Sequence, residues 1–119
     1  ILHEMKNTRD LKLSRLKEDL AGYIENNVQK DISLLDISEH FNLSPNYMSY
    51  LFKTVMKDNF KDYLSRRRFE VAARLLNQNP SIKLADLAEH IGINNVNTLI
   101  RMFNKYAGTS PGQFIKGRG

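Results

Sequence analysis

The strongest constraint on the fold of this chain is an internal repeat. Residues 34–41 and residues 84–91 share one pattern, with six of their eight positions identical or chemically similar. Phe52 in the first copy lies opposite Phe103 in the second, and residues 60–64 and 111–115 close the two copies in a similar way. A fixed period of this length indicates that one small unit is duplicated in tandem. We therefore expect two related subdomains.

Apolar residues recur at helical spacings along the chain, and strand signals are essentially missing. Spacings of three and four residues predict one long amphipathic helix in the first segment. Its apolar face is expected to hold Leu13, Leu16, Leu20, Tyr23, Ile24 and Val28. A second long helix is expected over residues 59–77, and Pro80 marks a clear break after it. The sequence therefore predicts an all-α fold.

Two serines predict where the shorter helices of the first copy begin. Ser33 is followed three residues later by Asp36, which is the spacing of a capping box. Ser44 precedes Pro45, and proline suits the first helical position because its missing N–H is not needed there. We expect this helix to cover residues 44–56. Its inward face is predicted to hold Tyr47, Met48, Leu51, Phe52 and Val55.

Composition narrows the possible functions. The 119 residues contain no cysteine, which excludes disulfides, thiol catalysis and thiolate metal sites and fits a reducing cytoplasm. No stretch has the roughly 18 apolar residues of a membrane span, and no signal peptide is evident. Because the chain does not begin with Met, we expect it to be a piece of a longer protein. The net charge is +5, and residues 91–119 carry four basic and no acidic side chains, which favours a polyanionic partner.

Each copy contains the elements of a helix-turn-helix. In the second copy, Ala88 provides the small residue where the two helices meet, and Gly92 can adopt the positive φ of the turn. In the first copy, Ser38 is the small residue and Asn42 takes the turn, because Asn tolerates the left-handed region better than other side chains. One such pattern is weak, but two copies favour DNA binding over a plain duplicated bundle.

The spacing of the two copies supports the same interpretation. A helix over residues 59–77 would be roughly 28 Å long at about 1.5 Å per residue. Successive major grooves on one side of B-DNA lie about 34–36 Å apart. A rigid connection of this length could therefore hold two recognition helices in adjacent major grooves.

The sequence resembles the DNA-binding domain of the AraC/XylS family of bacterial transcription regulators over residues 11–116. The most specific stretch, which resembles the family signature as a whole, contains Asp86, Leu87, Ala88, Gly92, Ile93, Leu99, Arg101, Phe103, Tyr106, Gly108, Ser110, Pro111 and Phe114. The middle of the family pattern is matched by Leu51, Phe52, Lys53, Tyr63, Leu64, Arg68, Phe69, Ala72, Leu75 and Leu76. Departures include Ile93 and Thr98-Leu99, where aromatic residues are usual, and Lys57, where a glycine often ends the first recognition helix.

The resemblance implies seven helices in two helix-turn-helix subdomains. We expect a linker at residues 1–10, a first subdomain at 11–58, a connecting helix at 59–77, a second subdomain at 78–116 and a frayed tail at 117–119. Members of the family commonly activate transcription and couple this domain to a sensor domain, which we expect to precede residue 1.

The outward residues of the two recognition helices, expected at 44–56 and 95–106, are the candidate DNA contacts. Arg can bridge guanine and Asn can bridge adenine, while apolar side chains meet thymine methyl groups. The candidates for reading bases are Asn46, Ser49, Tyr50, Val96, Asn97, Ile100 and Arg101. The candidates for the DNA backbone are Ser44, Lys53, Asn95, Asn104, Lys105 and Ser110.

Other features have simpler explanations. Residues 66–68 are three consecutive arginines, which spread around a helix, so Arg68 is expected to be structural at the subdomain junction and Arg66 and Arg67 to be solvated or near the DNA backbone. Asp36, Glu39 and His40 have metal-like spacing, repeated in the second copy, but acidic residues in a first turn favour the helix dipole. We expect no metal, no cofactor and no catalysis, because the chain lacks a nucleophilic triad and a phosphate loop.

The expected partners are double-stranded DNA and RNA polymerase, with no membrane. A two-headed module can bind DNA as a monomer, so we expect this fragment to be monomeric, and dimerisation of the full-length protein stays open. The alternatives are a helical adaptor, which would not bind duplex DNA, and an RNA-binding domain, which would need aromatic platforms for unpaired bases.

Overall fold

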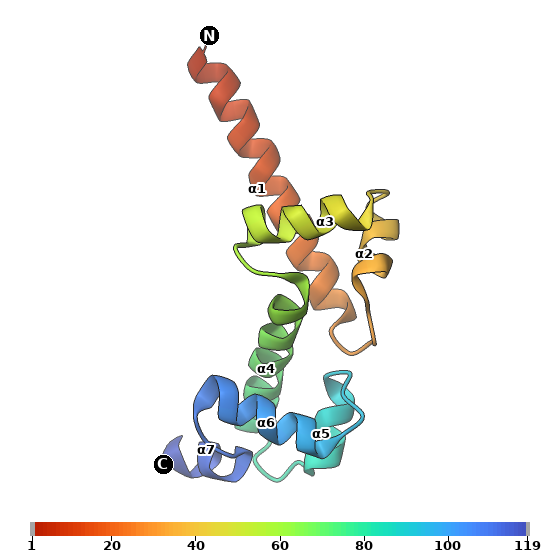
Figure 1. The fold of residues 1–119 in the computed structure, drawn as a ribbon. Coiled ribbons are helices and arrows are strands. Elements are labelled where there is room, and N and C mark those ends of the chain that lie inside the picture. Colours follow the sequence, from red (N-terminus) through yellow and green to blue (C-terminus); the bar gives the residue numbers. More distant parts are fainter. Residues whose placement is uncertain (1, 119) are drawn as a thin grey trace.

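The structure is a computed structural model that describes residues 2–118. This part of the chain is all-helical and contains seven helices and no strand, which confirms the predicted fold class (Figure 1). A short π-helical stretch, η1, continues the third helix. The elements are α1 (Leu2–Asn27), α2 (Leu34–His40), α3 (Pro45–Leu51), η1 (Phe52–Met56), α4 (Phe60–Gln78), α5 (Leu84–His90), α6 (Val96–Ala107) and α7 (Pro111–Arg118).

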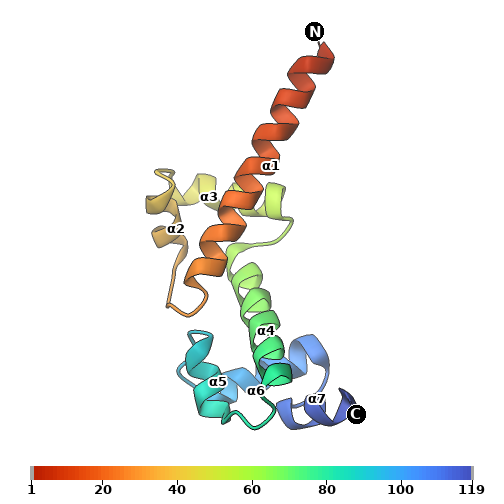
Figure 2. The same ribbon diagram turned by 180° about the vertical axis from the view of Figure 1, so that it is seen from behind.

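The two ends of the chain differ from the expected domain plan. Residues 2–10, expected to form a linker, are helical and belong to α1, whose first turns project from the body of the molecule (Figures 1 and 2). Residues 117 and 118, expected to be frayed, continue α7. Residues 1 and 119 lie outside the described part.

The first subdomain packs α1, α2, α3, η1 and the start of α4 around one core. Its buried side chains come from every one of these elements: Leu20, Ile24, Ile37, Met48, Phe52, Met56 and Leu64. Both predicted caps are present. At the start of α2, the Ser33 hydroxyl accepts a hydrogen bond from the backbone amide of Asp36, and the Asp36 carboxylate accepts one from the backbone amide of Ser33. At the start of α3, the Ser44 hydroxyl accepts a hydrogen bond from the backbone amide of Tyr47.

The second subdomain packs α5, α6 and α7 against the other end of α4. Val71, Ala72 and Leu76 of α4 are buried there with Leu87, Ile91, Leu99 and Phe103. The helix α4 therefore serves both cores, with Leu64 in the first and Val71 in the second. It begins one residue after the Asn59 cap and ends at Gln78, within one residue of the predicted 59–77.

Val28 joins the two halves. The sequence predicted that it would lie on the apolar face of the first helix, but it follows the end of α1 and is 5% exposed in the core of the second subdomain. The loop after α1 thus contacts the second subdomain, and the continuous helix α4 provides the other link between the two subdomains. The two subdomains are held by two connections.

Candidate nucleic-acid interface

The turn of the first helix-turn-helix is built as the sequence predicts. Ser38 is 1% exposed, and its hydroxyl donates to the Leu34 carbonyl oxygen at 2.7 Å, so the small side chain is buried without an unsatisfied group. Asn42 has φ 56°, in the left-handed region. The Leu43 amide then donates to the Ser38 carbonyl oxygen at 2.9 Å and redirects the chain toward α3.

The second turn repeats this geometry. Ala88 is 2% exposed, Gly92 has φ 77°, and the Ile93 amide donates to the Ala88 carbonyl oxygen at 2.9 Å. The bond joins the same pair of positions as in the first copy. The duplicated sequence therefore folds as a duplicated helix-turn-helix, in which α3 with η1 and α6 are the recognition helices.

The first recognition helix presents a polar outer face. Asn46, Tyr50 and Lys53 are exposed, and Ser49 is half-buried at the edge of the face. Ser44, proposed for the DNA backbone, lies at the N-cap. The helix ends at Lys57, which has φ 62°. This is the position where the family often has glycine, and the structure shows that lysine adopts the same left-handed conformation.

Tyr47 corrects the predicted inward face of this helix. It was expected in the core with Met48 and Leu51, yet its side chain is 51% exposed. Its ring lies beside that of Tyr50, with centroids 6.1 Å apart. The periodicity misplaced it because position 47 lies at the boundary between the buried and outer faces, and an apolar ring there can turn either way.

The second recognition helix begins at the Asn95 cap, whose side chain accepts a hydrogen bond from the Asn97 amide at 2.7 Å. Four of the predicted contact residues are exposed along it: Asn97, Arg101, Asn104 and Lys105. Val96 and Ile100, expected to face outward, are half-buried, so each offers only part of its side chain to a partner. The nearby Ser110 is half-buried and caps α7 by accepting from the Gln113 amide.

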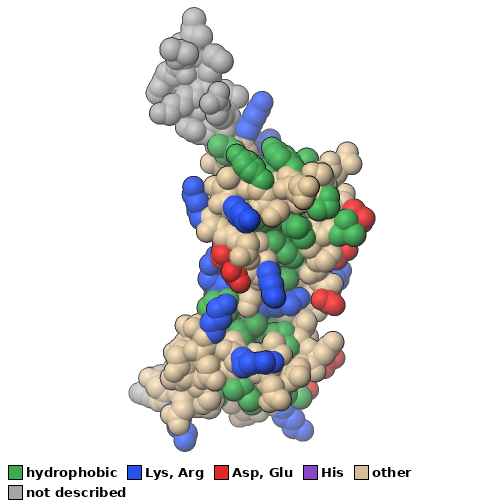
Figure 3. All heavy atoms as spheres, in the orientation of Figure 1, with side chains coloured by type: hydrophobic (Ala, Val, Ile, Leu, Met, Phe, Trp, Pro, Cys, Tyr) green, Lys and Arg blue, Asp and Glu red, His purple; other side chains and the backbone are tan. Residues whose placement is uncertain are grey.

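Both recognition helices lie on one face of the molecule. In Figure 1 they cross in front of the long helices, and in Figure 2, seen from behind, the long helices cross in front of them. Figure 3 shows that this face carries more Lys and Arg than Asp and Glu side chains, spread over both subdomains. An elongated basic face with two projecting helices suits a rod-shaped polyanion.

The three consecutive arginines have structural partners. Arg66 forms an ion pair with Asp58 at 2.7 Å, and Arg67 pairs with Glu25 and Glu70. These ion pairs were not predicted, because local sequence did not reveal that Glu25 on α1 faces Arg67, while the side chain of Arg66 stays 42% exposed. Their charges are largely compensated within the protein.

Arg68 is structural, as predicted. Its Nε donates to the Val28 carbonyl oxygen at 3.2 Å, and its Nη2 donates to that of Lys30 at 2.7 Å. Burial lowers the pKa of Arg68 from its usual value, while Asp31 acts in the opposite direction. The guanidinium thus satisfies two carbonyls in the loop that reaches the second subdomain.

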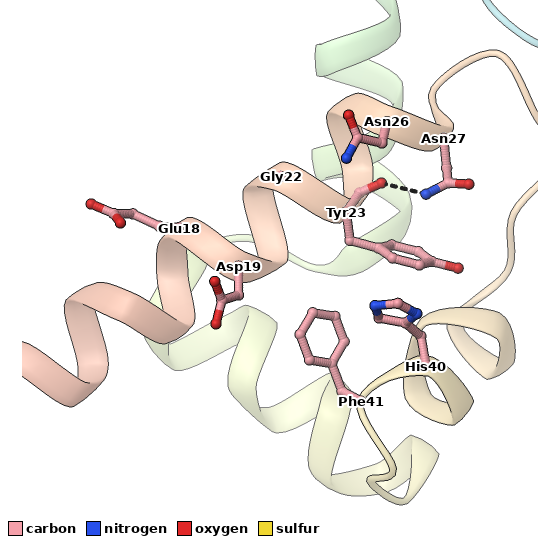
Figure 4. A pocket seen from close by; sticks show the side chains of 8 residues that line it. All are labelled: Glu18, Asp19, Gly22, Tyr23, Asn26, Asn27, His40 and Phe41. Carbon is pink, nitrogen blue, oxygen red and sulfur yellow. Dashed lines mark hydrogen bonds between the residues drawn. The ribbon is translucent and has the colours of Figure 1, made fainter.

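One groove of the described part has no lining residue on a recognition helix. It has a volume of about 740 Å³ between α1 and α2, with Tyr23, His40 and Phe41 on one side and Glu18 and Asp19 on the other (Figure 4). Carboxylates at its edge would repel phosphate, so this groove does not extend the basic face. Among the described residues, no three His, Cys, Asp or Glu side chains are grouped as metal ligands, and no helix is long and apolar enough to cross a membrane.

Known proteins are similar to this chain in sequence and architecture. A family profile described as "Helix-turn-helix domain" matches residues 37–117. The melibiose operon regulatory protein of Escherichia coli K12 is 29% identical over 97 residues, covering 82% of this chain and 32% of that protein. The regulatory protein PocR of Salmonella typhimurium is 30% identical over 98 residues, with the same two coverages. The chain spans about a third or less of the length of such curated relatives.

Solved structures agree with the sequence match. The C-terminal domain of the two-component response regulator yesN from Fusobacterium nucleatum superposes with a TM-score of 0.80 at 33% identity, covering 85% of this chain and 98% of that one. The C-terminal domain of the response regulator AraT from Geobacillus stearothermophilus gives 0.78 at 28% identity, covering 89% and 84%. With its duplicated turns and paired recognition helices, the chain belongs to the AraC/XylS family, as the DNA-binding domain of a transcription regulator.

Proposed function

We propose that this domain reads two successive major-groove segments of B-DNA, with α3 in one and α6 in the next. The observation that carries the proposal is that both recognition helices lie on one face, at opposite ends of α4 (Figure 1). The 19 residues of α4 span roughly 28 Å at about 1.5 Å per residue. This length is close to the 34–36 Å between successive major grooves on one side of the duplex.

Residue chemistry suggests how the two segments are read. Asn97 and Arg101 are exposed on α6 and are proposed to bridge purine edges, as Asn46 is proposed to do on α3. Lys53 and Lys105 are proposed to hold phosphates, because a flexible ammonium acts as a point charge. The N-cap residues Ser44, Asn95 and Ser110 are proposed to lie near the DNA backbone, because free backbone N–H groups at helix N-termini can bind phosphate. Asn104 is proposed to contact the DNA backbone as well.

Selection of bound duplexes from a random library tests this function directly. The selected site should contain two short blocks about one helical turn apart. The blocks should differ from each other, because Asn46 and Tyr50 offer different groups from Asn97 and Arg101. A single uninterrupted block, or a palindrome bound by two copies of the fragment, would contradict two active recognition helices.

We further propose that the longer protein is a cytoplasmic transcription activator that contacts RNA polymerase, with a sensing region outside this chain. Several relatives are regulators of sugar operons by name, such as the melibiose protein. The domain itself is proposed to bind as a monomer, because two recognition helices already occupy one extended site. Sedimentation of the complex with the selected duplex should give one fragment per site, and transcription from a promoter carrying that site should rise with the full-length protein.

A further inference from the structure

The described side chains include five large hydrophobic ones that are strongly exposed, and two of them lie together on the first recognition helix. These are Tyr47 at 51% and Tyr50 at 53%, while Leu11, Leu13 and Leu35 lie elsewhere. Single exposed apolar residues are ordinary on protein surfaces. A contacting pair on the element that approaches DNA is different, because it combines apolar surface with a position where a specific partner is expected.

The position of the pair on the helix shows what it can reach. At about 100° per residue, Tyr50 lies about 40° from Asn46 around the helix axis, and Tyr47 lies about 100° from Asn46 in the same direction. Tyr50 therefore stands near the middle of the outer face and Tyr47 on its flank. A helix inserted in the major groove directs its centre toward base edges and its flank toward one strand. Tyr50 would thus face the base edges, and Tyr47 would lie beside it, toward the strand on that side of the groove.

The rings form a shared apolar surface. Their centroids are 6.1 Å apart and their planes are inclined by 31°, so a small group placed over the boundary can contact both. Neither tyrosine forms a side-chain hydrogen bond in the described part of the chain. Stacked bases in a duplex cannot stack on these rings. The apolar group that the major groove does present is the 5-methyl group of thymine.

We propose that Tyr47 and Tyr50 together recognise the 5-methyl group of a thymine in the groove segment entered by α3. This inference rests on the proposed function, in which α3 reads a major groove. It assigns a specificity role to Tyr47, which periodicity places in the core, and it gives Tyr50 an apolar partner on the DNA.

The test compares thymine with deoxyuridine, which pairs identically but lacks the methyl group. After selection of the preferred duplex, each thymine in the α3 block is replaced singly by deoxyuridine and the Kd is measured. The native fragment should lose about fourfold in affinity at one position, since burying one methyl-sized group is worth about that factor. Tyr47→Ala and Tyr50→Ala should bind the thymine site more weakly and lose this discrimination.

Two further variants make the result specific. Tyr47→Phe should keep the discrimination, because the ring and not the hydroxyl makes the contact. Leu35→Ala removes an equally exposed apolar side chain outside the recognition helices, at 53%, and should change neither affinity nor discrimination. Circular dichroism of each variant confirms that the fold is retained, as expected for exposed positions.

Several outcomes would overturn the inference. These are an α3 block without thymine, a native fragment indifferent to deoxyuridine at every position, or a Tyr47→Ala variant with undiminished discrimination. Failure of the proposed function looks different, since the fragment would then select no bipartite site at all.

Discussion

Gly92 faces the carbonyl oxygen of Val28 so closely that a Cβ added to the glycine would lie 2.9 Å from it. The same Cβ would lie 3.1 Å from Nη2 of Arg68. The guanidinium of Arg68 is itself held by the carbonyl oxygen of Val28 through Nε and by that of Lys30 through Nη2. The turn of the second helix-turn-helix is therefore packed against the loop that ends α1. The glycine is required both by its φ of 77° and by this close approach.

Replacing Gly92 separates these two requirements when Gly108 serves as its control. Gly108 has φ 73° but no heavy atom within 4 Å of an added Cβ. Gly108→Ala should cost about 1 kcal/mol of unfolding free energy, the strain of a left-handed alanine. Gly92→Ala should cost at least about 1 kcal/mol more, because the backbone oxygen of Val28 cannot move cheaply. Denaturant unfolding measures both, and equal losses would show that the contact with Val28 carries no energy.

Arg68 is expected to hold the loop that joins the subdomains. Arg68→Met keeps much of the apolar stem but removes two hydrogen bonds to carbonyl oxygens, and it should destabilise the fold by about 1.5–3 kcal/mol. Arg74→Met is the matched control, since Arg74 is exposed on the same helix and should change stability by less than about 0.5 kcal/mol. Comparable melting temperatures for the two variants would show that the hydrogen bonds of Arg68 do not stabilise the junction between the subdomains.

Lys57 offers a stabilising change. Its φ of 62° strains a lysine but not a glycine, so Lys57→Gly should raise the unfolding free energy by about 0.5–1 kcal/mol. Asn42→Gly, at φ 56°, should gain less because Asn tolerates this region. Thermal unfolding of the two variants gives the comparison. A loss of stability in Lys57→Gly would mean that the lysine side chain makes a contact worth more than the strain.

Variants of Arg101 and Lys53 should distinguish base recognition from contact with the DNA backbone. Arg101→Ala should cost about 1–3 kcal/mol on the selected site and relax the preference at one base pair. Lys53→Ala should weaken all duplexes about equally and lower the salt slope by about one unit. Binding to the selected and scrambled duplexes across a salt series decides between these roles. A parallel loss on both duplexes for Arg101→Ala would make Arg101 a backbone contact.

Local features were predictable because they depend on neighbouring residues. The caps at Ser33 and Ser44 and the turns at Asn42 and Gly92 follow from side-chain chemistry within four positions, and the structure has each of them. The bounds of α4 were predicted to within a residue for the same reason. The repeat then extended each local inference to its second copy.

Contacts across the fold were not predictable from periodicity. Val28 continues the apolar spacing of α1 yet packs in the second core, because the chain turns away after Asn27. Arg67 pairs with Glu25, which is 42 residues away. Tyr47 occupies the edge of a helix face, where spacing alone does not decide its orientation.

Affinity as a function of the spacing between the two selected blocks tests the central claim most directly. The duplexes carry the unchanged blocks separated by the selected spacing, by about half a helical turn more, or by about one full turn more. Because α4 fixes the distance and orientation of α3 and α6, both insertions should reduce binding to the level of a duplex with one block. Undiminished affinity after a half-turn insertion would contradict a rigid domain that reads two adjacent major grooves from one face.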